Sequence, residues 1–300
     1  MSHLLHFAVM LACCLAAVRP LARARWVTRM PRTALLTWQI LGLTLELSLL
    51  GLVFAAVFAP ANQGLVPGLL HVASVDGVPT GPLAPAALAL GAAYLAARCW
   101  TLGRVCRDLA RHRRRHRHLL TLVARSREAL PGVEVLDHPV PAAYCLPGRP
   151  GLVVLSTGAL CLLGPRHLAA VVAHERAHLR QRHDLVLLPL LAWRRLLPRS
   201  PLLREAVAAV RLLLEMCADD ACCRRLPRRD LTDALARFTA AGGTVPPPAG
   251  GFAAADTAVT ARTARLLAPP PKTTAFARTA VLAVAATALS TPVSLFALPL

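Results

Sequence analysis

The sequence predicts a mainly α membrane protein with four transmembrane helices and a cytoplasmic α+β domain that contains a small sheet. The chain is 56% hydrophobic and only 16% charged, whereas soluble domains are about 45–50% apolar and about 25% charged. Its formal net charge is +19, and the arginines cluster beside long apolar segments. This combination excludes disorder along the whole chain and fits a membrane protein whose basic loops lie on one side.

Four apolar segments approach the roughly 20 residues that cross a bilayer as a helix. They lie at residues 4–22, 33–59, 83–102 and 280–300. No Lys or Arg precedes the first segment, whereas a signal peptide begins with positive charge, so we predict a membrane span there. The second segment contains one acid, Glu46, which is either functional or paired with a polar group of another span.

The arginines set the orientation of these spans, because cytoplasmic loops carry an excess of Lys and Arg. Five arginines, at positions 19, 23, 25, 29 and 32, lie at the end of the first span and in the loop after it, whereas the loop at 60–82 holds neither Lys nor Arg. The run Arg-His-Arg-Arg-Arg-His-Arg at 111–117 follows the third span. We therefore expect a multi-pass protein of the cell membrane. Residues 1–102 hold three spans, residues 103–279 form a cytoplasmic domain, and both termini lie outside.

The basic run at 111–117 also suggests a membrane-tethered nucleic-acid binder. No aromatic residue interleaves with the run, so stacking on bases is not supported. Attraction to anionic lipid, worth about 1 kcal/mol per charge near the surface, accounts for such a patch beside a span. We expect the lipid bilayer as a partner and no direct nucleic acid; steeply salt-dependent binding to DNA would reverse that expectation.

The cytoplasmic segment has the pattern of a mixed domain. Short apolar runs predict strands at 133–136 and 152–155, on either side of a turn-rich stretch at 139–150. Helical periodicity and end signals predict helices at 119–130, 167–188, 201–225 and 231–241, with Asp230 capping the last.

Two stretches of this segment have a different character. Three consecutive prolines and several glycines at 242–251 predict a flexible linker. Residues 185–193 are strongly apolar but too short to span a bilayer. We expect them either in the domain core or docked on the membrane surface.

Residues 174–178 have the sequence His-Glu-Arg-Ala-His. Positions four apart share one face of a helix, so His174 and His178 can direct an imidazole nitrogen at the same ion. Glu175 lies beside them, within reach of a water molecule on that ion. Apolar residues precede the motif, and a buried His-Glu-His cluster without a metal leaves its polar groups poorly compensated. The pattern predicts one bound Zn²⁺, with Glu175 as the catalytic residue.

A catalytic zinc site usually has three protein ligands. Glu215 is the best candidate for the third, because it lies among leucines on the next long helix. Asp219 follows four residues later on the same face and is expected to orient a ligating histidine. Asp184 and His183 are alternative third ligands. A third ligand at Asp184 needs a glycine at position 181 to turn the chain, and that residue is Gln. A third ligand at His183 requires the helix to bend.

These motifs resemble those of the membrane-embedded gluzincin metallopeptidases. The similarity is greatest to the BlaR/MecR antirepressor peptidases and more distant to the CAAX prenyl protease and HtpX-type proteases. It covers residues 100–270 and rests on His174-Glu-Arg-Ala-His178, Asp184 and Glu215-x-x-x-Asp219. The resemblance implies a zincin-like metallopeptidase fold for the cytoplasmic domain.

The resemblance also implies an activity. The chain would be a membrane-bound zinc endopeptidase that cleaves a cytoplasmic or membrane-proximal protein. The substrate expected from the family is a transcriptional repressor. A second copy of the chain, in a homodimer, is a further possible partner. A quality-control protease of membrane proteins and a non-catalytic zinc-binding scaffold are the alternatives. Beta-lactam receptors of that family carry a penicillin-binding domain after the last span, whereas this sequence stops at Leu300. We therefore expect no beta-lactam sensing of that kind.

Two further parts of the site are expected from general peptidase chemistry. One is an edge strand that pairs with an extended substrate, predicted at Leu152, Val153, Val154, Leu155 and Ser156. The other is a donor for the developing oxyanion. Its candidates are Tyr144, Arg262 and Arg265.

Overall fold

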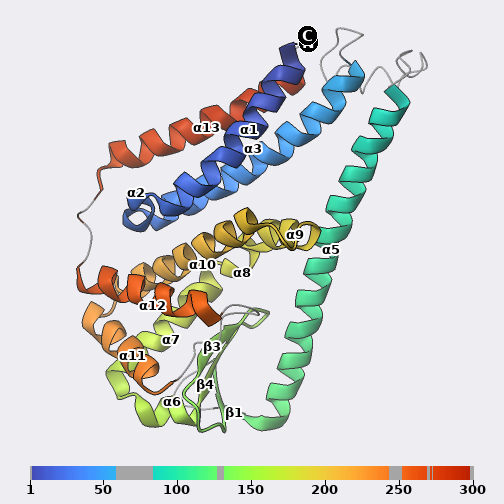
Figure 1. The fold of residues 1–300 in the computed structure, drawn as a ribbon. Helices are drawn as coiled ribbons and strands as arrows, with labels where there is room; N and C mark the ends of the chain where they lie inside the picture. Colours follow the sequence, from blue (N-terminus) through green and yellow to red (C-terminus); the bar gives the residue numbers. More distant parts are fainter. Residues whose placement is uncertain are drawn as a thin grey trace. The chain divides into compact units, whose positions relative to one another are not determined.

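The structure is a computed structural model whose described residues form two compact units. It describes residues 2–58, 84–126, 132–242, 252–268, 271 and 273–297. Unit 1 comprises Met1–Gly103, Pro189–Val207 and Thr273–Leu300, and unit 2 comprises Arg104–Leu188 and Ala208–Lys272. Figure 1 shows the helices and strands of both units. The loop expected at 60–82 and nearly all of the linker expected at 242–251 lie outside the described residues.

Unit 1 is entirely helical in its described part. Helix α3 is central in this unit, because it packs against both α1 and α13 (Figure 1). Its elements are α1 (Ser2–Arg23), α2 (Arg25–Arg29), α3 (Pro31–Phe58), the first half of α5 (Ala84–Val123), most of α9 (Leu188–Leu196), the start of α10 (Pro201–Cys222) and α13 (Ala275–Ala297).

Three helices in the described part of the chain are long and apolar enough to cross a membrane. They are His3–Arg23, Pro31–Ala55 and Ala275–Leu295, which correspond to the first, second and fourth expected spans. The third expected span forms the first half of α5 but is not among these candidates. Tyr94 and Arg98 interrupt its apolar sequence. The structure thus supports a membrane protein with three candidate spans, and four spans are not confirmed.

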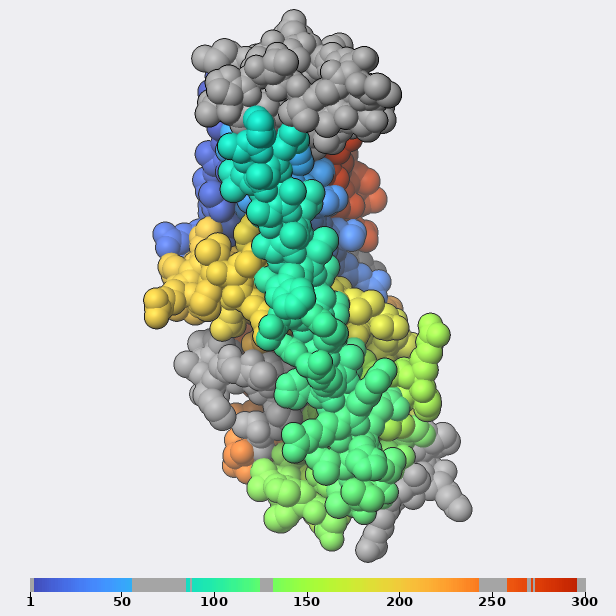
Figure 2. Space-filling model, turned by 90° about the vertical axis from the view of Figure 1, so that its right-hand side faces the viewer, coloured from blue at the N-terminus to red at the C-terminus, as the bar shows by residue number. Residues whose placement is uncertain are grey.

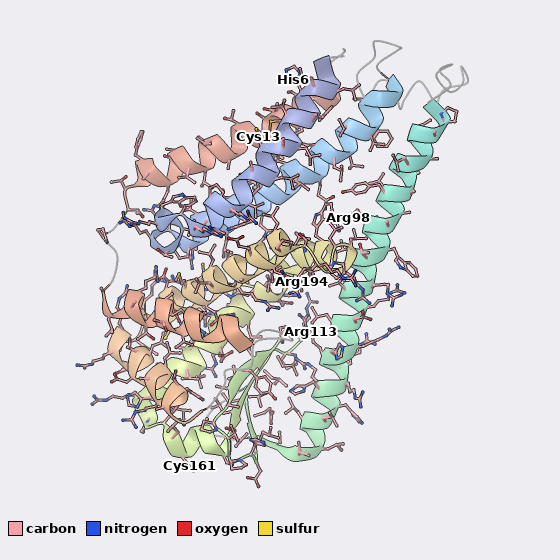
Figure 3. All side chains as sticks on the ribbon, in the orientation of Figure 1. His6, Cys13, Arg98, Arg113, Cys161 and Arg194 are labelled. Atoms are coloured by element: carbon pink, nitrogen blue, oxygen red, sulfur yellow. The ribbon has the colours of Figure 1, made fainter. Side chains whose placement is uncertain are left out.

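Glu46 of α3 pairs with polar groups of α5. Its carboxylate accepts hydrogen bonds from the hydroxyl of Tyr94 and the guanidinium of Arg98. The Arg98 guanidinium also lies 4.4 Å from the ring centroid of Trp193 on α9, a cation–π contact. Figure 3 labels Arg98 on α5. The single acid of the second span therefore pairs with a cation that would otherwise lie alone in an apolar environment.

We predict that Glu46→Gln destabilises unit 1, because Arg98 then keeps its charge without a carboxylate. Breaking a buried pair costs about 3–5 kcal/mol; this pair is partly exposed, with side chains 13% and 23% accessible, so about 1–3 kcal/mol is expected. Thermal unfolding in detergent micelles measures the effect. The double variant Glu46→Leu with Arg98→Leu should regain most of the loss, because it removes both charges. An unchanged melting temperature for Glu46→Gln would contradict this assignment.

Unit 2 contains a four-stranded sheet and the helices that cover it. The strand order is β1-β2-β4-β3; β2 and β4 are parallel, and the other two pairs are antiparallel. The elements are the second half of α5, β1 (Ala124–Ser126), β2 (Val133–Leu136), β3 (Ala143–Leu146), β4 (Leu152–Ser156), α6 (Thr157–Leu162), α7 (Pro165–Arg180), α8 (His183–Val186), the rest of α10, α11 (Arg228–Ala240) and α12 (Phe252–Leu267).

Several expectations about this sheet are wrong. Residues 124–126 form β1 where a helix was expected, because they pair with β2. Residues 143–146, within the stretch expected to be turns, form β3. Residues 152–156 do not form an edge strand, because β2 and β3 pair with β4 on both sides. Within the described residues, the sheet edge next to β4 belongs to β3.

The core of unit 2 lies between the sheet and α7 with α11. Val153 and Leu155 of β4 pack in one buried cluster with Val172 of α7 and Phe238 of α11. Asp230 does not cap α11 as expected: the N-cap position is Pro227, and Asp230 lies in the first turn, where its charge suits the positive end of the helix.

The helix expected at 167–188 ends early. It stops at Arg180, and Arg182 adopts a left-handed conformation with φ 50° and ψ 44°. The short α8 then begins at His183. Arg113 of α5 lies 3.1 Å from the carboxylate of Asp184 in α8, whose side chain is 7% exposed. This ion pair holds the turn after α7 against α5, and Figure 3 labels Arg113 on that part of α5.

The basic run at 111–117 thus makes contacts within unit 2 as well as forming an exposed surface. The guanidinium of Arg117 donates to the carbonyl oxygen of Pro150, and His116 hydrogen-bonds to Tyr144. Figure 2 shows the green second half of α5 on the surface of unit 2. Exposed basic side chains of the run lie at Arg111, Arg114 and Arg115. Lipid attraction alone therefore does not account for the run.

Candidate metal centre

Three side chains from two helices bring their donor atoms together. His174 and His178 lie one turn apart on α7, and their Nε2 atoms are 3.2 Å from each other. Glu215 projects from α10, with Oε2 3.3 Å from Nε2 of His174 and Oε1 3.4 Å from Nε2 of His178. One donor atom of each residue lies within 4.8 Å of the other two. The structure therefore contains a possible metal-binding triad of the three residues expected as ligands.

The spacing of these donor atoms fits a zinc ion. Tetrahedral zinc with bonds of about 2.0–2.1 Å to nitrogen and oxygen separates neighbouring ligand atoms by about 3.3–3.4 Å. The two Nε2 atoms are 3.2 Å apart, and each lies 3.3–3.4 Å from a different oxygen of the Glu215 carboxylate. Two neutral imidazoles and one carboxylate are a normal donor set for zinc, and three protein ligands leave a fourth position open.

Asp219 and Arg262 lie beside the triad. Oδ1 of Asp219 is 3.1 Å from Nδ1 of His174, the ring nitrogen that does not face the other donors. Arg262 of α12 donates to Asp219 through Nε and Nη2, at 2.9 and 2.7 Å, and its Nη1 lies 2.8 Å from Oε2 of Glu215. Arg262 is 4% exposed. One buried cation therefore compensates two carboxylates.

These contacts determine which groups carry charge. Burial opposes the ionisation of both carboxylates, but Arg262 and the histidines outweigh it: the pKa of Asp219 falls to about 2, and the pKa of Glu215 lies well below its ordinary value. Burial also opposes a proton on His174, but hydrogen bonds to Asp219 and Glu215 raise its pKa to about 10. The ring thus holds a proton that a metal ion would displace on binding.

Glu175 is buried next to the triad. It is 4% exposed, and its carboxylate accepts a hydrogen bond from the thiol of Cys145 on β3. Burial raises the pKa of Glu175, although the two neighbouring histidines oppose that shift. A carboxylate with a raised pKa accepts a proton more readily, as a general base requires.

Other expected residues lie outside the triad. Asp184, an alternative third ligand, pairs with Arg113. His183, the other alternative, lies against the second ring nitrogen of His178, with 2.9 Å between the two Nδ1 atoms. The hydroxyl of Tyr144 hydrogen-bonds to His116 at 2.7 Å. Arg265 is paired with Asp220 through two hydrogen bonds. Of the three oxyanion candidates, only Arg262 contacts a member of the triad in these interactions.

The sequence did not predict the contacts that Cys145 and Arg262 make at the site. Cys145 fell within the stretch expected to be turns, so its contact with Glu175 was missed. Arg262 was considered only as an oxyanion donor, not as the partner of Glu215 and Asp219. A partial signal exists for α12, since Arg262 and Arg265 share a helix face at a spacing of three and meet the consecutive acids Asp219 and Asp220.

Comparison with known families supports a membrane-associated metallopeptidase of the zincin type. The family model of peptidase family M48 matches residues 109–197. This region includes α7 with its two histidines and Glu175, and it ends before Glu215. No solved structure matches the chain. The closer resemblance to the BlaR/MecR peptidases is not confirmed by these comparisons.

We predict that Arg262→Leu lowers the free energy of unfolding of the metal-free protein by about 3–5 kcal/mol, because it leaves the buried carboxylate of Asp219 and the partly buried carboxylate of Glu215 uncompensated. Zinc should recover part of the loss by replacing the missing positive charge. Arg111→Leu is the matched control: this exposed arginine lies 3.6 Å from Asp108, and such surface pairs contribute about 0–1 kcal/mol. Thermal unfolding in detergent, with and without zinc, compares the variants. Equal stability of the two variants would show that Arg262 is not the compensating cation.

Proposed function

We propose that this protein is a membrane-bound zinc endopeptidase in which His174, His178 and Glu215 hold one zinc ion. The observation that carries the proposal is the convergence of these three donors beside a buried carboxylate, Glu175. The match to peptidase family M48 over α7 supports the same reaction class. A peptidase acts on a protein, and the candidate spans imply a lipid bilayer as its surroundings.

The reaction proposed for the site is hydrolysis of a peptide bond by water. Zinc, when bound, supplies a Lewis acid that polarises the substrate carbonyl and lowers the pKa of water. Glu175 takes a proton from the attacking water and passes it to the leaving amine. Cys145 donates to Glu175 and keeps that carboxylate oriented. Asp219 holds the ring of His174 through Nδ1, which leaves Nε2 for the metal.

The free edge of β3 is the proposed binding surface for an extended substrate. Within the described residues β3 pairs only with β4, and it carries Cys145, which contacts Glu175. A peptide added to this edge as a strand would therefore run past the proposed base. This role replaces the one expected for residues 152–156, which are enclosed between two strands.

The substrate proposed for this site is a cytoplasmic or membrane-proximal protein, such as the transcriptional repressor that the resemblance suggests. The basis for a cytoplasmic site is the excess of arginine beside the spans, which also places both termini outside. The proposed topology also requires a fourth span, in the first half of α5. Quality control of membrane proteins is the alternative activity on the same site.

We expect Glu175→Gln to leave zinc bound and to lower kcat/KM by about 10²–10⁴-fold, the usual contribution of general acid–base catalysis. Zinc content and cleavage of protein substrates are measured on the same preparation, with amino-terminal proteomics of the host cell to find the cleaved proteins. Glu205→Gln is the matched control, since this carboxylate pairs with Arg19 and Arg23 in unit 1, whereas the triad belongs to unit 2.

Removal of zinc with a chelator should abolish cleavage by the wild-type protein, and added zinc should restore it. A protein that binds zinc but shows the same cleavage pattern in wild type and Glu175→Gln would be a zinc-binding scaffold, not a peptidase. Absence of zinc binding by the wild-type protein would refute the proposed metal centre.

A further inference from the structure

His183 is a buried histidine placed behind His178. The residue is 6% exposed, and its Nδ1 lies 2.9 Å from Nδ1 of His178. The two rings are perpendicular, with centroids 4.7 Å apart. On the opposite side, Nε2 of His178 faces His174 and Glu215. His178 therefore directs one ring nitrogen at the proposed metal position and the other at His183.

The backbone fixes this contact. The left-handed conformation of Arg182 ends α7, and α8 begins directly after it at His183. The next residue, Asp184, is held by Arg113 of α5. A defined turn and a paired neighbour thus position the backbone of His183 next to His178.

The proton arrangement of this pair follows from the need for a lone pair on Nε2 of His178. A neutral imidazole carries one proton, so a ring that binds metal through Nε2 has its proton on Nδ1. That proton points at Nδ1 of His183, which must accept it and must carry its own proton on Nε2. Oε1 of Gln181 lies 3.4 Å from that Nε2 and is an acceptor. Each donor in this series has an acceptor.

We propose that His183 is a positioning residue that holds His178 in the orientation and tautomer required to bind zinc. The two proposed ligand histidines then have different partners: His174 is held by the carboxylate of Asp219, and His178 by a neutral imidazole. This inference rests on the proposed function, because it concerns a ligand of the same zinc site. It assigns to His183 a role other than the direct ligation considered from the sequence.

Zinc affinity of the full-length protein in detergent micelles tests the proposal. The protein is stripped of metal, and Zn²⁺ binding is measured by competition with a chromophoric chelator. His183→Phe fills a similar volume but accepts no hydrogen bond, and it should raise the zinc dissociation constant by about 10–100-fold, as loss of an outer-shell partner commonly does. In His183→Asn the amide oxygen can accept at nearly the same position, so affinity should return close to the wild-type value.

His112→Ala serves as a control, since it removes an exposed histidine of α5 and should leave zinc affinity unchanged. Thermal unfolding of the metal-free variants separates folding from metal binding. Wild-type affinity in a folded His183→Phe, or an equal loss in the Phe and Asn variants, would overturn the positioning role. Failure of the wild-type protein to bind zinc would instead refute the proposed function, so the two failures are distinguishable.

Discussion

The guanidinium of Arg262 is the interaction on which the rest of the candidate metal centre depends. Helix α10 brings Glu215 and Asp219 into a buried region, where two neighbouring carboxylates disfavour each other's ionisation. Arg262 bonds to both and keeps both pKa values low. Only an ionised Glu215 is a good metal donor. The docking of α12 on α10 therefore sets the charge state of the site as well as packing the unit.

Much of this centre was predictable because it is built from local helix geometry. His174 with His178, and Glu215 with Asp219, are pairs four residues apart, so each pair shares a helix face without any knowledge of the fold. Contacts between residues distant in the sequence were not predictable in the same way. Arg262 meets Asp219 across 43 residues, and β3 exists because it pairs with β4, although its own sequence lies in a turn-rich stretch.

Hydropathy identified the candidate membrane spans where their sequences are uniformly apolar, as in α1, α3 and α13. It was least informative for α5, whose first half contains Tyr94 and Arg98. The structure supplies the missing information, because both side chains bond to Glu46 of another helix. A charge that lowers the hydropathy of one segment thus pairs with an acid that is equally unusual in a second segment. Hydropathy scores each segment alone and cannot register that pairing.

The different partners of the two histidines agree with the charge balance of the proposed site. Glu175, Glu215 and Asp219 contribute three negative charges, which one guanidinium and one divalent cation neutralise. A carboxylate at position 183 would also accept the proton of His178, but it would leave the buried site with an uncompensated negative charge. A neutral imidazole orients His178 without that cost. The acid behind His174 is tolerated because Arg262 already bonds to it. The same charge balance leaves no positive charge over for a second acid behind His178.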